Sequence, residues 1–106
     1  MANTFKSYLS PNITASTTVH TGPASTQTTV IGLSIANVSV SLATISVTLT
    51  RGSTVAYIVK NAQIPVGDSL ILFGGDQKLV SQAGDLLKVQ SDNAVDVVVS
   101  VLEIVP

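Results

Sequence analysis

Apolar and polar residues alternate most regularly in residues 43–50 (ATISVTLT). Every second residue from Ala43 to Leu49 is apolar, and each residue between them is Ser or Thr. Because successive side chains of a strand point to opposite sides of a sheet, this pattern predicts a half-buried strand with one solvated face. Residues 51–53 (RGS) form a turn signal and residues 55–61 (VAYIVKN) alternate again, so we expect the two segments to form a hairpin.

Two longer segments carry small or apolar residues on both faces, as expected for strands in the middle of a sheet. In residues 26–37 (TQTTVIGLSIAN), we expect Ile31, Leu33 and Ile35 to share one face, with Val30 on the other. Residues 95–105 (VDVVVSVLEIV) predict a long last strand in a central position.

Shorter strands are predicted between turn-forming clusters, at residues 17–21, 69–73, 77–80 and 86–90. The clusters combine Gly, Pro, Asn, Asp and Ser, which favour turns through their backbone preferences or through local hydrogen bonds. They are Gly22-Pro23, Pro65 to Gly67, Gly74-Gly75-Asp76, Ala83-Gly84-Asp85 and Ser91-Asp92-Asn93.

The first 25 residues are the least regular part of the chain. Residues 5–9 are either a short strand or an arm, and Pro11 with Asn12 is expected to end that segment. Turn signals roughly 8–12 residues apart, about eight or nine strands and no segment with a helical period predict an all-β, single-domain antiparallel β-sandwich over residues 1–106. A jelly-roll and an immunoglobulin-like topology both stay open, as do an arm and an edge strand for residues 1–25.

Composition agrees with this fold and removes several functional classes. Apolar residues make up 45% of the chain, and half of them are β-branched valine and isoleucine, which fit a pleated surface. Only 10% of residues are charged, the net charge is −1, and the five basic residues are scattered, so nucleic-acid binding is not expected. The chain has no cysteine, which excludes disulfides and thiol chemistry. With neither a secretory signal pattern nor a membrane-length apolar run, we expect a soluble protein made in the cytoplasm.

Candidate catalytic and metal-binding residues do not assemble into a motif. His20 is the one histidine, and it is interpreted as a loop or strand-edge residue rather than a base or ligand. Four of the acids (Asp68, Asp76, Asp85 and Asp92) fall at predicted turns, where Asp bonds its own backbone. We therefore expect no catalytic residue, no metal and no cofactor.

Three weaker functional interpretations compete with plain structural ones. Asp92, Asn93 and Asp96 offer oxygen ligands for calcium but match no known loop spacing. Gly74-Gly75 lacks the ending of a phosphate loop, so a hairpin turn is favoured. Exposed Tyr57 stacking on a sugar, with Asp92 and Asn93 as hydrogen-bond partners, would make the chain a host-glycan-binding module.

A resemblance emerges when four segments are joined: TTVIGLSIAN, YIVKNAQIPVGDSL, GGDQKLV and VDVVVSVLEI. Together they resemble a family of small virion proteins encoded by tailed bacteriophages, notably those of marine cyanobacteria. The resemblance runs from about Thr4 to Ile104 and is a pattern of strand and turn residues, with Gln63 where a second proline is expected. It implies a structural protein without catalysis that is located in the virion.

The resemblance favours a capsid decoration, or cement, protein that bridges capsid subunits as a homo-oligomer, with a trimer favoured. Its expected partner is the major capsid protein, and Phe5, Tyr8 and Leu9 are the candidate partner-binding residues, either filling a groove or adding a strand to a partner's sheet. A neck, tail or fibre adaptor of the same virion is the first alternative, and the glycan-binding module is the second.

Overall fold

The computed structural model describes residues 2–72 and 78–105, and these residues contain nine β-strands and no helix. The strands are β1 (Ala2–Ile13), β2 (Thr17–Thr21), β3 (Gln27–Asn37), β4 (Ala43–Arg51), β5 (Thr54–Ile64), β6 (Ser69–Leu72), β7 (Leu79–Ser81), β8 (Leu86–Ser91) and β9 (Val95–Val105). The predicted strand at residues 17–21 and the last strand at residues 95–105 have the predicted bounds. The predicted turn at Gly74-Gly75-Asp76 lies outside the described residues.

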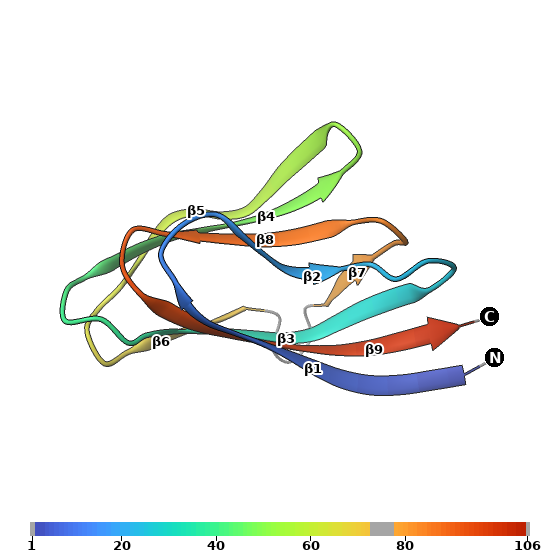
Figure 1. Cartoon of the computed structure of the whole chain (residues 1–106), viewed down its shortest axis with the longest axis horizontal. Helices are drawn as coiled ribbons and strands as arrows, with labels where there is room; N and C mark the ends of the chain where they lie inside the picture. The colour runs from blue at the N-terminus through green and yellow to red at the C-terminus, as the bar shows by residue number, and fades with distance from the viewer. Residues whose placement is uncertain (1, 73–77, 106) are drawn as a thin grey trace.

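The strands form two antiparallel sheets that face each other (Figure 1). One, called here the β1 sheet, has the order β1-β9-β3-β6, with β7 also paired to β3. The other, the β2 sheet, has the order β2-β8-β4-β5. The predicted antiparallel β-sandwich is therefore confirmed, and the last strand is central, with β1 on one side and β3 on the other.

The pairings are nested along the chain. The first strand pairs with the last, β2 pairs with β8, β3 pairs with β6 and β7, and β4 pairs with β5 in the predicted hairpin. The arrangement is that of one long hairpin, folded back at the β4–β5 turn and rolled so that its two arms supply both sheets. Gly52 occupies that turn with a positive φ of 60°, a conformation that glycine adopts without a Cβ clash.

The core lies between the sheets and consists almost entirely of branched aliphatic side chains. Each buried side chain of this kind stabilises the fold by roughly 1.5–3 kcal/mol relative to an exposed one. On β9 the inward positions alternate strictly, as a strand requires. The fully buried large side chains are Leu33, Ile35, Ile45, Ile64, Leu87, Val30, Val47, Val89, Val95, Val97, Val99 and Val101.

The expected faces of β3 were wrong in one respect. Val30, rather than Ile31, shares the buried face with Leu33 and Ile35. The reason is a shift of register between Val30 and Gly32 in the pairing of β3 with β9. A β-bulge inserts one extra residue and so reverses the alternation on one side of it, and a glycine inside a strand is a common sign of such a bulge.

The segment of residues 1–25 contains two strands, and β1 is the edge strand of the β1 sheet. Pro11 and Asn12 were expected to end the first strand, but pairing resumes at Ile13, opposite Val95. The register shifts between Ser10 and Ile13, Asn12 has a φ of 54°, and its backbone N–H donates to Asp96 Oδ1 at 2.9 Å. The two residues thus form a bulge at the sheet edge, where the missing N–H of proline costs no ladder hydrogen bond.

Candidate functional site

The outward face of the β1 sheet carries several large exposed apolar side chains among serine and other polar residues, and we call this face the outer apolar face. Side chains that alternate away from the core on β1, β9, β3, β6 and β7 supply it. Phe5 and Leu9 are 73% and 72% exposed, and Ile71 is 69% exposed. The large exposed apolar residues of this face are Phe5, Leu9, Ile71, Val80 and Val98. Clusters of exposed apolar side chains of this kind mark interaction surfaces more often than single ones do.

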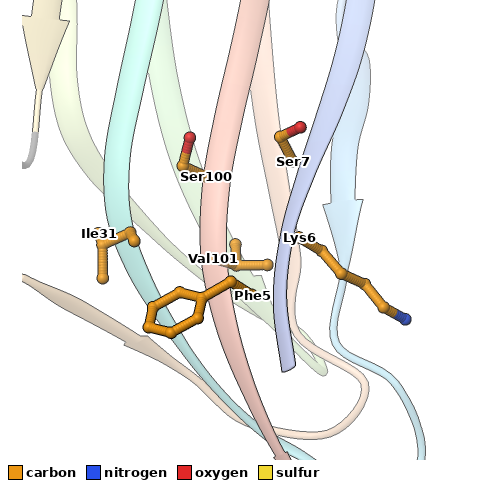
Figure 2. Close-up of a pocket in the computed structure, with 6 residues that line it drawn as sticks. All are labelled: Phe5, Lys6, Ser7, Ile31, Ser100 and Val101. Carbon is orange, nitrogen blue, oxygen red and sulfur yellow. The ribbon is translucent and has the colours of Figure 1, made fainter. Parts of the chain in front are cut away.

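An open depression of about 360 Å³ lies at one end of this face. Its lining includes Phe5, Ser7 and Ile31. Figure 2 shows the Phe5 ring lying across β9 toward Ile31, while Lys6 points to the opposite side of β1. Because Phe5 is largely exposed, its ring forms a wall of the depression and leaves apolar surface in contact with water.

A second depression of about 240 Å³ lies farther along β1. Leu9, Pro11 and Val98 line it together with Asp96 and neighbouring backbone. Leu9 and Val98 are cross-strand partners in the β1–β9 register, so their side chains stand on the same face. The two depressions therefore lie on one continuous surface, with Ser7 and its partner Ser100 between Phe5 and Leu9.

The outward face of the β2 sheet is polar by contrast. Its central strands β4 and β8 turn hydroxyl, amide and amine groups outward, opposite the core residues Val47 and Leu87. These outward residues are Thr44, Ser46, Thr48, Lys88 and Gln90. The solvated face predicted for residues 43–50 lies here, and exposed large apolar side chains on this sheet are confined to its edge strand β5, at Val55 and Tyr57.

The three sequence-derived candidates for partner binding divide between the two faces of β1. Phe5 and Leu9 lie on the outer apolar face, whereas Tyr8 points inward and packs against the core. Tyr8 Oη donates a hydrogen bond of 2.5 Å to Glu103 Oε2, and the Tyr8 ring meets His20 edge-on with centroids 5.0 Å apart. Tyr8 is thus part of a buried polar cluster between β1, β2 and β9.

Glu103 is the centre of that cluster. It is 5% exposed, and Lys6 Nζ lies 3.2 Å from its Oε1. The hydrogen bond from Tyr8, and secondarily the neighbouring Lys6, hold the pKa of the Glu103 carboxyl below its usual value although burial alone would raise it. The carboxylate is therefore charged and paired, as a buried charge must be.

His20, interpreted from the sequence as a loop or strand-edge residue, belongs to an edge strand, and its side chain is buried. It lies in β2 and is 4% exposed, because a register shift between Thr18 and His20 turns both Val19 and His20 inward. His20 Nε2 is 3.7 Å from Glu103 Oε2, and neither ring nitrogen has a hydrogen-bond partner among the described residues. Burial lowers the pKa of His20, so the ring is neutral at neutral pH.

A second buried carboxylate, Asp85, fixes the turn between β7 and β8. It accepts hydrogen bonds from Arg51 Nε at 2.8 Å and Nη2 at 2.7 Å, and from the backbone N–H of Gln82 at 2.8 Å. The Arg51 guanidinium is the largest influence that lowers the pKa of Asp85. Asp85 therefore does bond its own turn, as predicted for an acid at this position, and it also ties that turn to the β4–β5 hairpin.

The residues that offered oxygen ligands for calcium are hydrogen-bonded to separate backbone groups. Asp92 Oδ1 accepts from Thr44 N at 2.8 Å, Asp96 Oδ1 accepts from Asn12 N, and Asn93 Nδ2 donates to the carbonyl of Leu42. Within residues 2–72 and 78–105, no group of three His, Asp or Glu side chains is arranged to hold a metal ion.

The residues of the glycan interpretation do not come together. Tyr57 is exposed and lies opposite Thr48, with Lys60 Nζ 5.1 Å from its ring centre. Asp92 is hydrogen-bonded to Thr44, which lies four residues from Thr48 along β4 and so about 13 Å away.

In the described part of the chain there is no helix long and apolar enough to cross a bilayer.

No family model matches the chain, and no curated protein matches it. Two solved structures are similar to it, and both are described as a pentameric capsid protein isolated from metagenomic phage sequences, one of them solved by iodide SAD phasing. Each is 22% identical, covers 90% of this chain and superposes with a TM-score of 0.43. This chain spans only 59% and 60% of those chains. Similarity at this level transfers neither fold nor function, so the proposals below rest on this chain's own residues.

Proposed function

We propose that this chain is a non-enzymatic structural protein of a bacteriophage virion, and that it acts as a capsid decoration protein bridging neighbouring capsid subunits. The observation that carries the proposal is the outer apolar face. A domain with 10% charged residues, whose β1 sheet exposes Phe5, Leu9, Ile71, Val80 and Val98 on one face, is suited to adhesion through that face.

The strand order supports a viral shell role. If β6 and β7 are taken as one interrupted strand, the nested pairing of β1 with β9, β2 with β8, β3 with β6/β7 and β4 with β5 is that of a jelly roll. Viral capsid and lectin domains commonly have this architecture. The fold does not decide the function by itself, and the resemblance of the sequence to small tailed-phage virion proteins favours the viral role over the lectin role.

The bridging role follows from the position of the apolar residues. Phe5 and Leu9 lie at one edge of the face, while Ile71 and Val80 lie on the strands beyond β3. A surface spread over the whole sheet can contact two neighbouring subunits at once, and several weak contacts then combine into firm attachment. A trimer stays a prediction from the sequence.

The test is attachment to particles. In virions that carry this chain, Ile71→Ser with Val80→Ser is expected to reduce the number of copies per particle and to lower the temperature at which packaged DNA is released. The matched control is Val55→Ser with Tyr57→Ser, which removes exposed apolar surface from the edge of the β2 sheet. Equal copy numbers for both variants would contradict the proposal.

Copy number also separates the alternative positions in the particle. A number comparable with that of the major capsid protein fits a decoration protein. A number equal to one or a few rings would instead indicate the neck, tail or fibre adaptor that the sequence leaves open.

A further inference from the structure

The edge of the β1 sheet formed by β1 is long and regular. Nine consecutive residues, from Ala2 to Ser10, pair with β9 without a register shift. In the described part of the chain, β1 has a strand partner only on its β9 side, so its other side presents a row of backbone N–H and C=O groups. Such an edge is a template for another strand.

The other sheet edges are each shortened or distorted. In the β2 sheet, β2 is five residues long with a register shift, and β5 has two register shifts against β4 together with Asn61 at a φ of 56°. On the far edge of the β1 sheet, β6 and β7 have four and three residues. These are features by which proteins prevent edge-to-edge pairing, and within residues 2–10 of β1 Lys6 is the one residue of a protective type.

The charge that Lys6 brings to β1 is neutralised by an ion pair. Lys6 Nζ lies 3.2 Å from Glu103 Oε1, and Figure 2 shows the Lys6 side chain extending away from β9. Pro11, the other residue type that blocks edges, lies beyond the regular segment at the bulge. The outward positions of the regular segment are Asn3, Phe5, Ser7 and Leu9.

The sequence of β1 is symmetric in character about Ser7. Phe5 and Leu9 are both large and apolar, Thr4 and Ser10 both carry small hydroxyls, and Lys6 and Tyr8 both have long stems with a polar end. A strand with this pattern is complementary to an antiparallel copy of itself. Such a pair has a twofold axis, which is the symmetry of most homodimers.

We propose that two copies of this chain pair through β1, antiparallel, with the twofold axis at Ser7, so that the two β1 sheets join into one continuous sheet. Phe5 of each copy then lies opposite Leu9 of the other, and Thr4 lies opposite Ser10. Apolar and hydroxyl pairs of these kinds stabilise an antiparallel sheet.

The register with its axis at Ser7 is favoured because the alternative registers on either side of it are less stable. A twofold axis normal to the sheet keeps every side chain on its own face. The axis must therefore lie midway between the two copies of one residue, which are directly opposite each other. An axis at Lys6 would place two like charges directly opposite each other. An axis at Tyr8 would place Leu9 opposite Ser7 and lose both apolar pairs.

Pairing at Ser7 would also double the outer apolar face. The two copies of Phe5 and Leu9 would meet at the centre of the joined sheet, flanked on both sides by Val98. The inference rests on the geometry of β1 and not on the virion role, so either proposal can fail while the other stands.

The register is tested by cysteine cross-linking of the purified full chain, which contains no cysteine of its own. Directly opposite residues have Cα atoms about 4.5–5.5 Å apart, within the range that a disulfide spans. Ser7→Cys is therefore expected to form a disulfide-linked dimer under mild oxidation. Asn3→Cys is the matched control on the same strand face, because its two copies would lie eight residues, or about 27 Å, apart.

Complementary charges introduced at Phe5 and Leu9 test the same residue pairs without a covalent bond. Phe5→Glu and Leu9→Lys, each alone, are expected to raise the dimer dissociation constant in sedimentation equilibrium by about tenfold. The double variant should restore dimerisation, because each introduced charge then faces its opposite in the other copy. Within one chain the two positions are about 13 Å apart and do not pair. Circular dichroism establishes that each variant is folded.

Three outcomes would overturn the proposal. They are a monomer at every concentration without cross-linking of Ser7→Cys, a trimer or pentamer in which Ser7→Cys does not cross-link, and equal cross-linking of Ser7→Cys and Asn3→Cys. A protein that is monomeric alone but acquires a strand from a capsid protein belongs to the first outcome.

Discussion

Tyr8 and Glu103 join the first and last strands through a buried hydrogen bond of 2.5 Å from the Tyr8 hydroxyl to the carboxylate. The two residues are not direct cross-strand partners, since Tyr8 lies opposite Val99 and Glu103 lies opposite Thr4. The hydrogen bond therefore runs diagonally along the sheet, and it satisfies one of the two buried charges that the sandwich contains among its described residues.

Removing this hydrogen bond should destabilise the fold. In Tyr8→Phe, Glu103 keeps Lys6 but loses its nearest donor, and we expect the free energy of unfolding to fall by about 1–3 kcal/mol. Urea denaturation followed by circular dichroism measures the change. Tyr57→Phe is the matched control, because Tyr57 is exposed, and it should change stability by less than about 0.5 kcal/mol. Equal effects of the two variants would show that the buried bond contributes nothing.

Stability should depend on pH on both sides of a plateau between about pH 7 and pH 9. On the acid side, burial lowers the pKa of folded His20 below 6.5, so the unfolded chain takes up a proton first and stability falls as the pH drops below that value. The lowered pKa of Glu103 adds a second loss below about its unperturbed value of 4.5. On the alkaline side, the pKa of Tyr8 is raised from 10.0 to about 12, so its contribution is lost as the pH rises through that interval.

His20→Gln isolates the first of these transitions. The variant has no group that titrates near pH 6.5 at this position, so its urea midpoint should be level from about pH 7 to pH 5, where the parent protein loses stability. Its absolute stability can differ from that of the parent, and the slope with pH is the readout. A slope equal to that of the parent would mean that His20 is not the responsible group.

Replacing Arg51 should destabilise the protein, and the more so the fewer interactions the Asp85 carboxylate keeps. Arg51→Met leaves a buried carboxylate with only the N–H of Gln82, whereas Arg51→Lys keeps a positive charge but loses the two-pronged geometry. We expect the urea midpoint to decrease from parent to Lys variant to Met variant. Lys60→Met, which removes an exposed charge on β5, is the control and should leave the midpoint unchanged.

Two glycines should respond differently to the same substitution. A Cβ on Gly22 would overlap the carbonyl oxygen of Gln82, in backbone that is itself held by the bond from Gly84 N to Gly22 O. A Cβ on Gly52 would meet nothing within 4 Å, so Gly52→Ala costs only the left-handed backbone conformation, about 1 kcal/mol. Gly22→Ala is therefore expected to lower the thermal midpoint more than Gly52→Ala, and the reverse order would contradict the close approach.

Local alternation predicted most of the strands because one face of each sheet is buried. Residues 95–105 and 43–50 could be predicted as strands for this reason, and turn residues such as Gly52 marked where strands end. What alternation misses is a residue that interrupts it. The bulges at Val30–Gly32, Ser10–Ile13 and Thr18–His20 each change which side chain is buried, and tertiary pairing decides where they occur.

The sequence of the last strand does contain a signal for the buried polar cluster. Glu103 has the same parity as Val97, Val99 and Val101, so the alternation of the last strand already places this carboxylate on the core side. Its partners could not be found in the same way, because Tyr8 and His20 are more than eighty residues away along the chain. The outer apolar face was likewise hidden, since it joins strands from both ends of the sequence.

The position of β9 between β1 and β3 has a consequence for biosynthesis. β9 leaves the ribosome after β1 and β3, and both of these strands pair with it, so each has an open edge until residues 95–105 have been translated. Contacts between residues so far apart in sequence form slowly, and strands that wait in this way are prone to wrong associations between nascent chains. Truncation within β9 should therefore yield an aggregating polypeptide rather than a smaller stable domain.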